Sequence, residues 1–208
     1  EQTALNNHYQ YDSGLDFNTL NKLALREFDE LVKILIKNGI KVTIHQDNQN
    51  PETPDSLFPN NWISFHDKHK VILYPMFAKN RRDERSSHVF DSLKESGVNT
   101  KIIYNLSNYE NLNMYLEGTG SMVLDRVNKK LYASLSDRTD DSVILDFSKK
   151  MDYKPIIFSS YQTVDDKRLK IYHTNVMMSI GDNFAAVGFD SIDDIAERNM
   201  VYNELKND

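Results

Sequence analysis

Hydrophobic and polar positions along the chain follow one order of elements: two short apolar strands, a helix and a further strand. Apolar runs over 62–66 and 71–74 are separated by a polar turn, which predicts a hairpin. A helix is predicted over about 83–96, where Gly97 ends the pattern, and 101–104 is a short strand. Hairpin, helix and strand together make the first unit.

A second unit of the same kind follows. Its hairpin covers 116–125 and 131–135, Thr139 caps its helix, and 155–158 is its closing strand. Acidic residues directly after Thr139 and the basic pair 149–150 suit the two ends of a helix dipole. The pattern therefore predicts a complete repeat of the first unit.

A third unit begins in the same way. Its hairpin covers 171–180 and 184–189, and Ser191 with Asp194 resembles a capping box that opens a helix. A period of this size is typical of repeat or propeller-like architectures. The hairpins are spaced by 55 residues (117 − 62 and 172 − 117), since they begin near Trp62, Glu117 and Tyr172.

Both ends of the repeat are incomplete. A helix over about 20–35 and a strand over 40–44 have no complete hairpin before them, and no strand follows the third helix. We therefore predict an α/β propeller of ββαβ repeats, incomplete at both ends, rather than an ordinary α+β domain. The chain is predicted to be a single domain over 1–208, with a partial unit at about 1–46, units at 62–105 and 116–160, and an incomplete unit at 171–208.

Composition limits the class of protein. With 39% hydrophobic residues the chain can form the core of one domain, and its net charge of −6 argues against nucleic acid or an anionic membrane as a partner. No apolar run approaches the ~20 residues that span a bilayer. The histidines lack ligand-like spacing and the chain has no cysteine, so neither a metal nor a cofactor is expected. No signal peptide is visible, and the default location is cytoplasmic.

Four short motifs occur in order along these units: DSLFPNNW at 55–62, LEGTG at 116–120, SDRT at 136–139 and YHTN at 172–175. Together they resemble the guanidine-modifying (amidinotransferase/arginine deiminase, pentein) superfamily, and within it the citrulline-hydrolase-like amidinotransferase branch. The fold of that superfamily is a five-bladed α/β propeller of hairpin, helix and strand units around a central site. This agrees with the repeat that the hydrophobic pattern predicts independently.

The resemblance implies attack by a cysteine on the planar carbon of a guanidino or ureido group, through a covalent adduct. His173 would be the general acid/base, since imidazole titrates near neutrality, and Glu117 would accept hydrogen bonds from substrate N–H groups. Arg138 would bind the α-carboxylate, with Arg81 assisting, and Asp55 would hold the amine. Elsewhere Glu117 and His173 could be ordinary core residues, but their positions at equivalent hairpins favour the functional interpretation.

Two positions differ from arginine deiminases, where the Asn61 and Asn175 positions are aspartates that face a cationic guanidinium. An amide both donates and accepts, whereas a buried carboxylate opposite a neutral group would lack its compensating charge. We therefore hypothesise a neutral ureido substrate such as citrulline rather than arginine. The Gly120 position often carries an acid in relatives, which leaves the role of the Gly-Thr-Gly turn open.

The chain has no cysteine, although the reaction that the resemblance implies needs one as its nucleophile. The resemblance places the nucleophile in a fifth unit beyond Asp208, so we expect a fragment that is inactive alone and belongs to a C–N hydrolase. Amidino transfer, or a catalytically silent binding protein on the same propeller, are the alternatives. The expected partner is a small guanidino or ureido amino acid, and the pattern does not indicate an oligomeric state.

Overall fold

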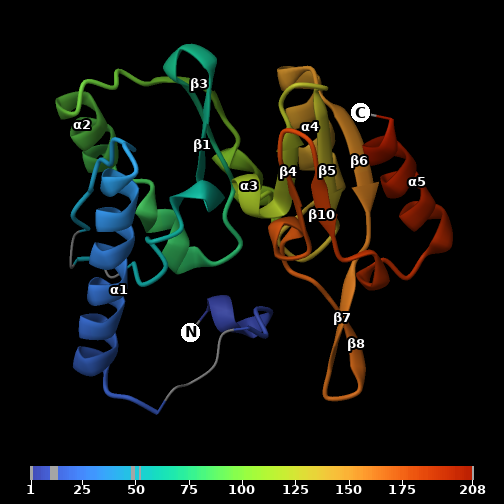
Figure 1. Ribbon diagram of the computed structural model, residues 1–208, viewed down its shortest axis with the longest axis horizontal. Coiled ribbons are helices and arrows are strands. Elements are labelled where there is room, and N and C mark those ends of the chain that lie inside the picture. Colours follow the sequence, from blue (N-terminus) through green and yellow to red (C-terminus); the bar gives the residue numbers. More distant parts are fainter. Residues whose placement is uncertain (1, 10–13, 48–49, 52, 208) are drawn as a thin grey trace.

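The computed structural model describes residues 2–9, 14–47, 50–51, 53–207. The two larger sheets have three strands each. Figure 1 shows them side by side, with the short helix α3 (Gly118–Ser121) between them at the centre. Helices α1 (Phe17–Lys37) and α2 (Ser87–Glu95) lie beyond one sheet, and α5 (Ile195–Lys206) beyond the other. The fold is mixed α/β, as predicted. Both sheets are open, and the described residues form no closed sheet.

The first sheet follows the predicted order. Strands β1 (Ile63–His66) and β2 (Lys70–Leu73) form an antiparallel hairpin, and β3 (Lys101–Asn105) runs parallel to β2. The hairpin and the third strand are confirmed. Helix α2 begins later than predicted, because Ser86 caps it and the residues before Ser86 form a separate 3₁₀ segment, η4 (Lys79–Glu84).

The second sheet has the same topology. Strands β4 (Met122–Asp125) and β5 (Lys130–Ser134) are antiparallel, and β6 (Lys154–Phe158) pairs in parallel with β5 after helix α4 (Asp141–Met151). Two details of the prediction were wrong. The first strand does not extend back over 116–121, where α3 forms instead, and the helix cap is Asp140, whose side chain accepts from the Ser142 amide.

The third unit contains the hairpin β9 (Met178–Ile180) and β10 (Ala185–Val187), followed by α5. The sequence did not predict the preceding hairpin of β7 (Tyr161–Val164) and β8 (Lys167–Lys170). Its turn consists of two aspartates with positive φ, the backbone that a tight hairpin requires. The predicted strand over 171–177 was wrong, because a 3₁₀ turn occupies part of it. The three hairpins begin at Ile63, Met122 and Met178, so their spacing is not constant.

The amino-terminal helix is confirmed and the strand after it is not. Asp16 caps α1 by accepting from the Thr19 amide at 3.1 Å, and Gly39 ends it with a φ of +79°. The predicted strand over 40–44 pairs with none of the described residues. Ile40 and Ile44 are 51% and 53% exposed, and none of the described strands lies beside this segment to complete its backbone hydrogen bonds. The partial unit predicted at 1–46 also includes residues 10–13, which lie outside the described residues.

Helices and sheets alternate through the core. Trp62 and Leu73 pack with α2 on one face of the first sheet, and α4 lies between the two sheets. Strand β5 sends alternate side chains to opposite faces, so Leu131 contacts the layer that contains α4 while Tyr132 faces the third unit. None of the described helices is long and apolar enough to cross a membrane.

Candidate active site

Three helical turns meet at the centre of the molecule, each directly before the first strand of a hairpin. They are η2 (Pro59–Asn61), α3 and η6 (Thr174–Val176), and α3 contacts both of the others. Three of the four predicted motifs contain residues of these turns, and the fourth, SDRT, is joined to α3 by the bond that Ser121 Oγ donates to the Arg138 carbonyl at 2.8 Å. The repeat therefore builds the site.

Two glycines allow this close approach. Gly118 has a φ of +47°, and a Cβ there would lie 2.3 Å from the carbonyl oxygen of Asn60. A Cβ at Gly120 would lie 2.4 Å from Asn61 Nδ2 and 2.8 Å from His173 Nδ1. The Gly-Thr-Gly turn, whose role the sequence left open, thus makes room for the side chains of its two neighbours.

Glu117 and His173 form a buried pair beneath this turn. His173 Nε2 lies 2.7 Å from Glu117 Oε2, and the two residues are 4% and 0% exposed. Glu117 also accepts from the Phe77 amide at 2.9 Å and from Arg138 Nη1 at 3.4 Å. Its carboxylate is therefore surrounded by protein donors and does not line the cavity described below.

The environment separates the charge states of the pair. Burial would raise the pKa of Glu117, but the bond to His173 and the charges of His173, Arg138 and Arg81 outweigh it and hold the pKa at about 2. For His173 burial is the largest influence and lowers the pKa below 6.5, against the raising effect of Glu117. At pH 7 we therefore assign a carboxylate and a neutral imidazole. Three protein donors keep Glu117 ionised even beside an uncharged ring.

This arrangement also determines the tautomer of His173. An ionised carboxylate only accepts, so Nε2 carries the proton and donates to Glu117 Oε2. The other ring nitrogen, Nδ1, has no hydrogen-bond partner among the residues that the structure describes, and His173 lines the cavity. The pair therefore presents an unprotonated nitrogen that can act as a base.

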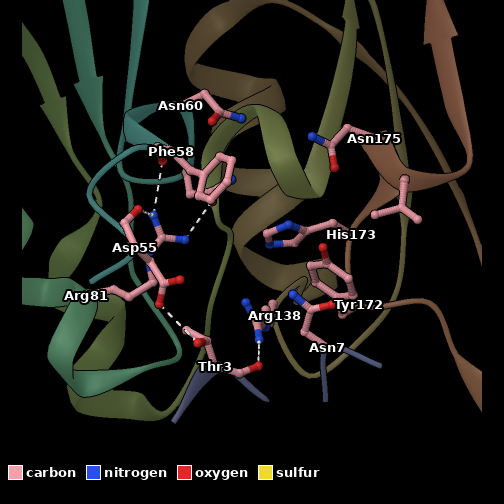
Figure 2. A pocket seen from close by; sticks show the side chains of 12 residues that line it. Thr3, Asn7, Asp55, Phe58, Asn60, Arg81, Arg138, Tyr172, His173 and Asn175 are labelled. Carbon is pink, nitrogen blue, oxygen red and sulfur yellow. Dashed lines mark hydrogen bonds between the residues drawn. The ribbon is translucent and has the colours of Figure 1, made fainter. Parts of the chain in front are cut away.

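Arg138 lies below His173 in Figure 2 and is 2% exposed. Its Nε and Nη2 both donate to Asn6 Oδ1, at 2.9 and 2.5 Å, and Nη2 also donates to the Thr3 carbonyl at 2.7 Å. The Tyr172 ring stacks under the guanidinium at 4.9 Å. The fork expected to hold a substrate carboxylate thus holds an amide oxygen of the amino-terminal segment.

Arg81 is enclosed by bonds to its own loop. Its Nε and Nη2 bind Glu84 at 2.8 and 2.9 Å, and Nη1 donates to Asn61 Oδ1 at 2.6 Å. Nη2 also donates to two backbone carbonyls, those of Asp55 and Phe58. These bonds connect the first motif to η4, so Arg81 positions the loop on which Asn61 lies. A substrate contact of Arg81 stays a prediction.

The bond to Arg81 orients Asn61. A guanidinium has only donors, so the Asn61 atom that faces it is the oxygen, and Nδ2 is directed toward Gly120 and His173. The exposed Asn175 lies above His173 in Figure 2, on the same side of the cavity. Asp55, on the opposite side, accepts from Thr3 Oγ1 at 3.0 Å.

These side chains surround a cavity of about 260 Å³, a size suited to an amino acid. Six of the seven predicted site residues line it: Asp55, Asn61, Arg81, Arg138, His173 and Asn175. The sequence missed the contributions of Thr3, Asn6 and Glu84. An arginine and a glutamate three positions apart could have indicated the buried ion pair, but no pattern indicated the amino-terminal segment.

The described residues contain no group of three or more His, Cys, Asp or Glu side chains that could hold a metal ion. The cavity lining offers the imidazole of His173, the amides of Asn61 and Asn175 and the guanidinium of Arg138, and the carboxylate of Glu117 lies behind the imidazole.

Comparison with known proteins agrees with this architecture. Residues 1–208 match the model of the family described as N,N dimethylarginine dimethylhydrolase, eukaryotic. No curated protein gives a significant match. ArgZ, an arginine dihydrolase from the ornithine–ammonia cycle in cyanobacteria, superposes with a TM-score of 0.65 at 16% identity, over 88% of this chain and 27% of ArgZ.

Further solved structures show the same fold. The amino-terminal domain of ArgZ, covalently bound to a reaction intermediate, gives a TM-score of 0.66 at 16% identity over 89% of this chain and 62% of that domain. AgrE in complex with L-arginine gives 0.63 at 19% identity, over 88% of this chain and 25% of AgrE. An adduct of dimethylarginine dimethylaminohydrolase gives a TM-score of 0.55 at 13% identity, over 86% of this chain and 65% of that protein. The chain thus spans about a quarter of full-length ArgZ or AgrE.

The repeated units and the four motifs that meet at their centre define the guanidine-modifying, or pentein, superfamily. Within it, the chain belongs to the dimethylarginine dimethylhydrolase family, whose model it matches along its length.

Proposed function

We propose that this chain is part of a hydrolase that breaks a C–N bond in a guanidino or ureido amino acid. The observation that carries the proposal is the buried Glu117–His173 pair, joined at 2.7 Å, at a cavity that Arg138 also lines. Family membership supports it, as do the arginine dihydrolase activity ascribed to ArgZ and the L-arginine bound to AgrE.

The proposed reaction has two stages. His173 Nδ1 takes the proton of a cysteine thiol, and the thiolate attacks the central carbon of the substrate group. The C–N bond then breaks as His173 returns the proton to the leaving amine, and a carbon–sulfur adduct remains. His173 next removes a proton from water, whose oxygen attacks the same carbon and releases the thiolate. Because the chain has no cysteine, we propose that the thiol comes from outside it and that the chain alone is inactive.

For Glu117 we propose a positioning role in addition to the predicted contact with substrate N–H groups. Its carboxylate holds the Nε2–H tautomer of His173 and stabilises the imidazolium that forms during the reaction. Its complete burial and its three protein donors support this role. Direct contact with the substrate stays a prediction.

For Arg138 we propose that the substrate α-carboxylate replaces Asn6 Oδ1 at the guanidinium fork. The two bonds that Nε and Nη2 donate to one amide oxygen support this role, because a carboxylate oxygen could accept the same two bonds. Asp55 lies across the cavity and would hold the substrate amine, while Asn175 is placed at the rim.

The orientation of Asn61 bears on the identity of the substrate. Its Nδ2 donor is directed toward His173, and a ureido oxygen accepts a hydrogen bond while a guanidinium offers only donors. This supports a neutral ureido substrate such as citrulline. The family name and the relatives instead favour arginine and its methylated derivatives, and the two possibilities are separable by experiment.

Binding tests the substrate with this chain alone. Calorimetric titration with citrulline, arginine and dimethylarginine should show citrulline as the tightest ligand. Arg138→Gln should weaken binding by about tenfold or more, because a charge-assisted fork is lost. The exposed Arg168→Gln is the matched control and should leave binding unchanged. The ureido hypothesis would be contradicted if the wild-type chain bound arginine more tightly than citrulline and Asn61→Asp gave no gain in arginine affinity.

Turnover tests the chemistry in a protein that contains this chain together with the cysteine. His173→Asn should lower kcat by about 10²- to 10⁴-fold while the substrate Kd changes little. Product that forms only when an amine acceptor is added would instead identify amidino transfer. Binding without turnover, even with an intact thiol, would identify the catalytically silent alternative.

We also propose that the complete protein is a closed five-unit propeller. This chain would form part of that single domain and contribute the units described above. The identical topology of the two sheets and the meeting of η2, α3 and η6 support this arrangement. A structure of the complete protein with an open row of units would contradict it. The cytoplasmic location stays a prediction.

A further inference from the structure

A second cavity, of about 400 Å³, lies at the far ends of the first two hairpins. The turns of the candidate active site come directly before β1 and β4. This cavity is instead lined by residues at or after the ends of those strands, including His66, Lys70, Arg126 and Lys129. It is therefore separate from the site described above, and nothing in the proposed reaction uses it.

Positive charge is concentrated around this cavity in a chain whose net charge is −6. Four cationic side chains line it, and two carboxylates do: Lys70, Arg126, Lys129 and Lys150, with Asp67 and Asp152. Lys150 is paired with Asp146 at 2.5 Å. Among the described residues the other three cations have no carboxylate partner within ion-pairing distance. With the two carboxylates counted, the lining keeps a net charge of +2 (four cations less two carboxylates), which favours an anion between the cations.

Neutral rings hold two of these cations at the cavity. The Lys129 ammonium lies 4.8 Å from the centroid of the Tyr153 ring, and Arg126 Nη1 lies 3.3 Å from His66 Nδ1. A ring face attracts an ammonium without neutralising it, so the charge stays available to a ligand. Tyr104 also lines the cavity and, with Tyr153, offers aromatic surface beside the cations.

His66 supports the same conclusion. Burial, followed by the charges of Arg126 and Lys129, lowers its pKa to about 4, so the ring is neutral at pH 7. A neutral ring that accepts from Arg126 at Nδ1 carries its proton on Nε2, which donates to Ser64 Oγ at 2.8 Å. His66 therefore orients Arg126 and offers no negative charge to balance it.

We propose that this cavity binds a small phosphorylated molecule. Arg126 would take two phosphate oxygens through its planar fork, and Lys70 and Lys129 would contact the remaining oxygens as point charges. The cavity is larger than one phosphate requires, and Tyr104 and Tyr153 provide surface for an attached organic group. A di- or triphosphate ester fits both the charge and the size.

The test uses calorimetric titration with pyrophosphate and, separately, adenosine diphosphate. Saturable binding of pyrophosphate is expected, and the double variant Arg126→Gln/Lys129→Gln should weaken it by about tenfold or more. The matched control, Arg26→Gln/Lys22→Gln on α1, removes the same two kinds of exposed charge elsewhere and should leave the affinity unchanged. Lys129→Arg keeps the charge and should retain binding.

Each outcome decides the proposal. Tighter binding of adenosine diphosphate than of pyrophosphate supports a phosphate ester that contacts the tyrosines, and equal binding supports recognition of the phosphates alone. Absence of saturable pyrophosphate binding overturns the proposal, and so does an equal loss in the two double variants, which would indicate a general charge effect. Circular dichroism of each variant confirms that the fold is retained. Citrulline binding depends on the other cavity, so a chain that fails to bind citrulline can still bind pyrophosphate here. Likewise, a failure to bind pyrophosphate leaves the proposed function unaffected.

Discussion

At the scale of single residues, the site depends on atoms that are absent. Gly120 has no side chain, and the space it leaves is where Asn61 Nδ2 and His173 approach each other. Gly120 contributes one backbone hydrogen bond, from its amide to the Glu117 carbonyl at 3.0 Å, and no side-chain contact. Its role is steric, and it follows from the convergence of three turns rather than from any property of the turn alone.

We predict that Gly120→Ala lowers the free energy of unfolding by about 1–3 kcal/mol, because its Cβ would lie only 2.4 Å from Asn61 Nδ2. Urea denaturation followed by circular dichroism measures the change. Gly188→Ala is the matched control, since a Cβ there would lie 3.6 Å from the nearest atom, an ordinary contact. Equal effects of the two substitutions would show that the space beside Gly120 is not tightly packed.

The sequence predicted which side chains would meet but not all of their partners. His173 and Asn61 could be named because they occur in recognisable motifs. Asn6 could not, because its bond to Arg138 joins residues 132 positions apart and depends on where the amino-terminal segment lies. A residue that takes part through a single long-range contact leaves no local pattern.

At the scale of elements, helix ends were the least accurate part of the prediction. For α5 the structure shows Asp194 as the cap, where its side chain accepts from the Glu197 amide at 2.9 Å. Ser191, which the sequence favoured, donates instead to the Gly188 carbonyl at 2.7 Å. Both residues can cap a helix, and only the path of the chain before α5 decides between them.

We predict that Asp194→Ala lowers the free energy of unfolding by about 1 kcal/mol, because loss of the cap leaves the Glu197 amide in the first turn of α5 without its side-chain acceptor. Ser191→Ala should change it by less than about 0.5 kcal/mol, as for other exposed positions. Thermal unfolding of the two variants compares them directly. A larger loss of unfolding free energy for Ser191→Ala than for Asp194→Ala would indicate that Ser191 caps the helix, as the sequence suggested.

Strands were predicted well where a partner is present and poorly where it is not. The runs at 63–66 and 70–73 became strands because each completes the other's hydrogen bonds. The alternating segment over 40–44 has the same kind of pattern, yet it pairs with no described strand. Alternation therefore predicts which segments can pair, and the availability of a neighbour decides which do.

At the scale of the whole molecule, buried ionisable groups make stability depend on pH. The pKa values of His173 and His66 are lowered below the 6.5 of an unfolded histidine, with burial as the first cause in both. Below that value the unfolded chain binds more protons than the folded chain, so stability must fall as the pH falls. Glu117, held at about 2, extends the loss below its unfolded value of 4.5.

We predict that the free energy of unfolding decreases steadily from pH 6.5 to pH 5, and that His66→Gln or His173→Gln flattens this part of the curve. Denaturant titrations at several pH values measure it. We limit the prediction to pH 5 and above, because burial raises the pKa of Glu84. Protonation of Glu84 at lower pH would stabilise the folded chain and oppose the effect of the histidines. An unchanged slope in both single variants would mean that other groups cause it.

The sequence by itself determined the order of hairpin, helix and strand in the first two units, the alternation of apolar positions within them and the four motifs, because these depend on neighbours within a few residues. Only the tertiary structure decided the rest. It placed η2, α3 and η6 against one another, gave Glu117 three protein donors, filled the Arg138 fork with Asn6 and gathered unpaired cations around a second cavity. The reason is physical: burial, charge balance and steric fit are set by residues far apart in the chain, and they exist only after the units have packed.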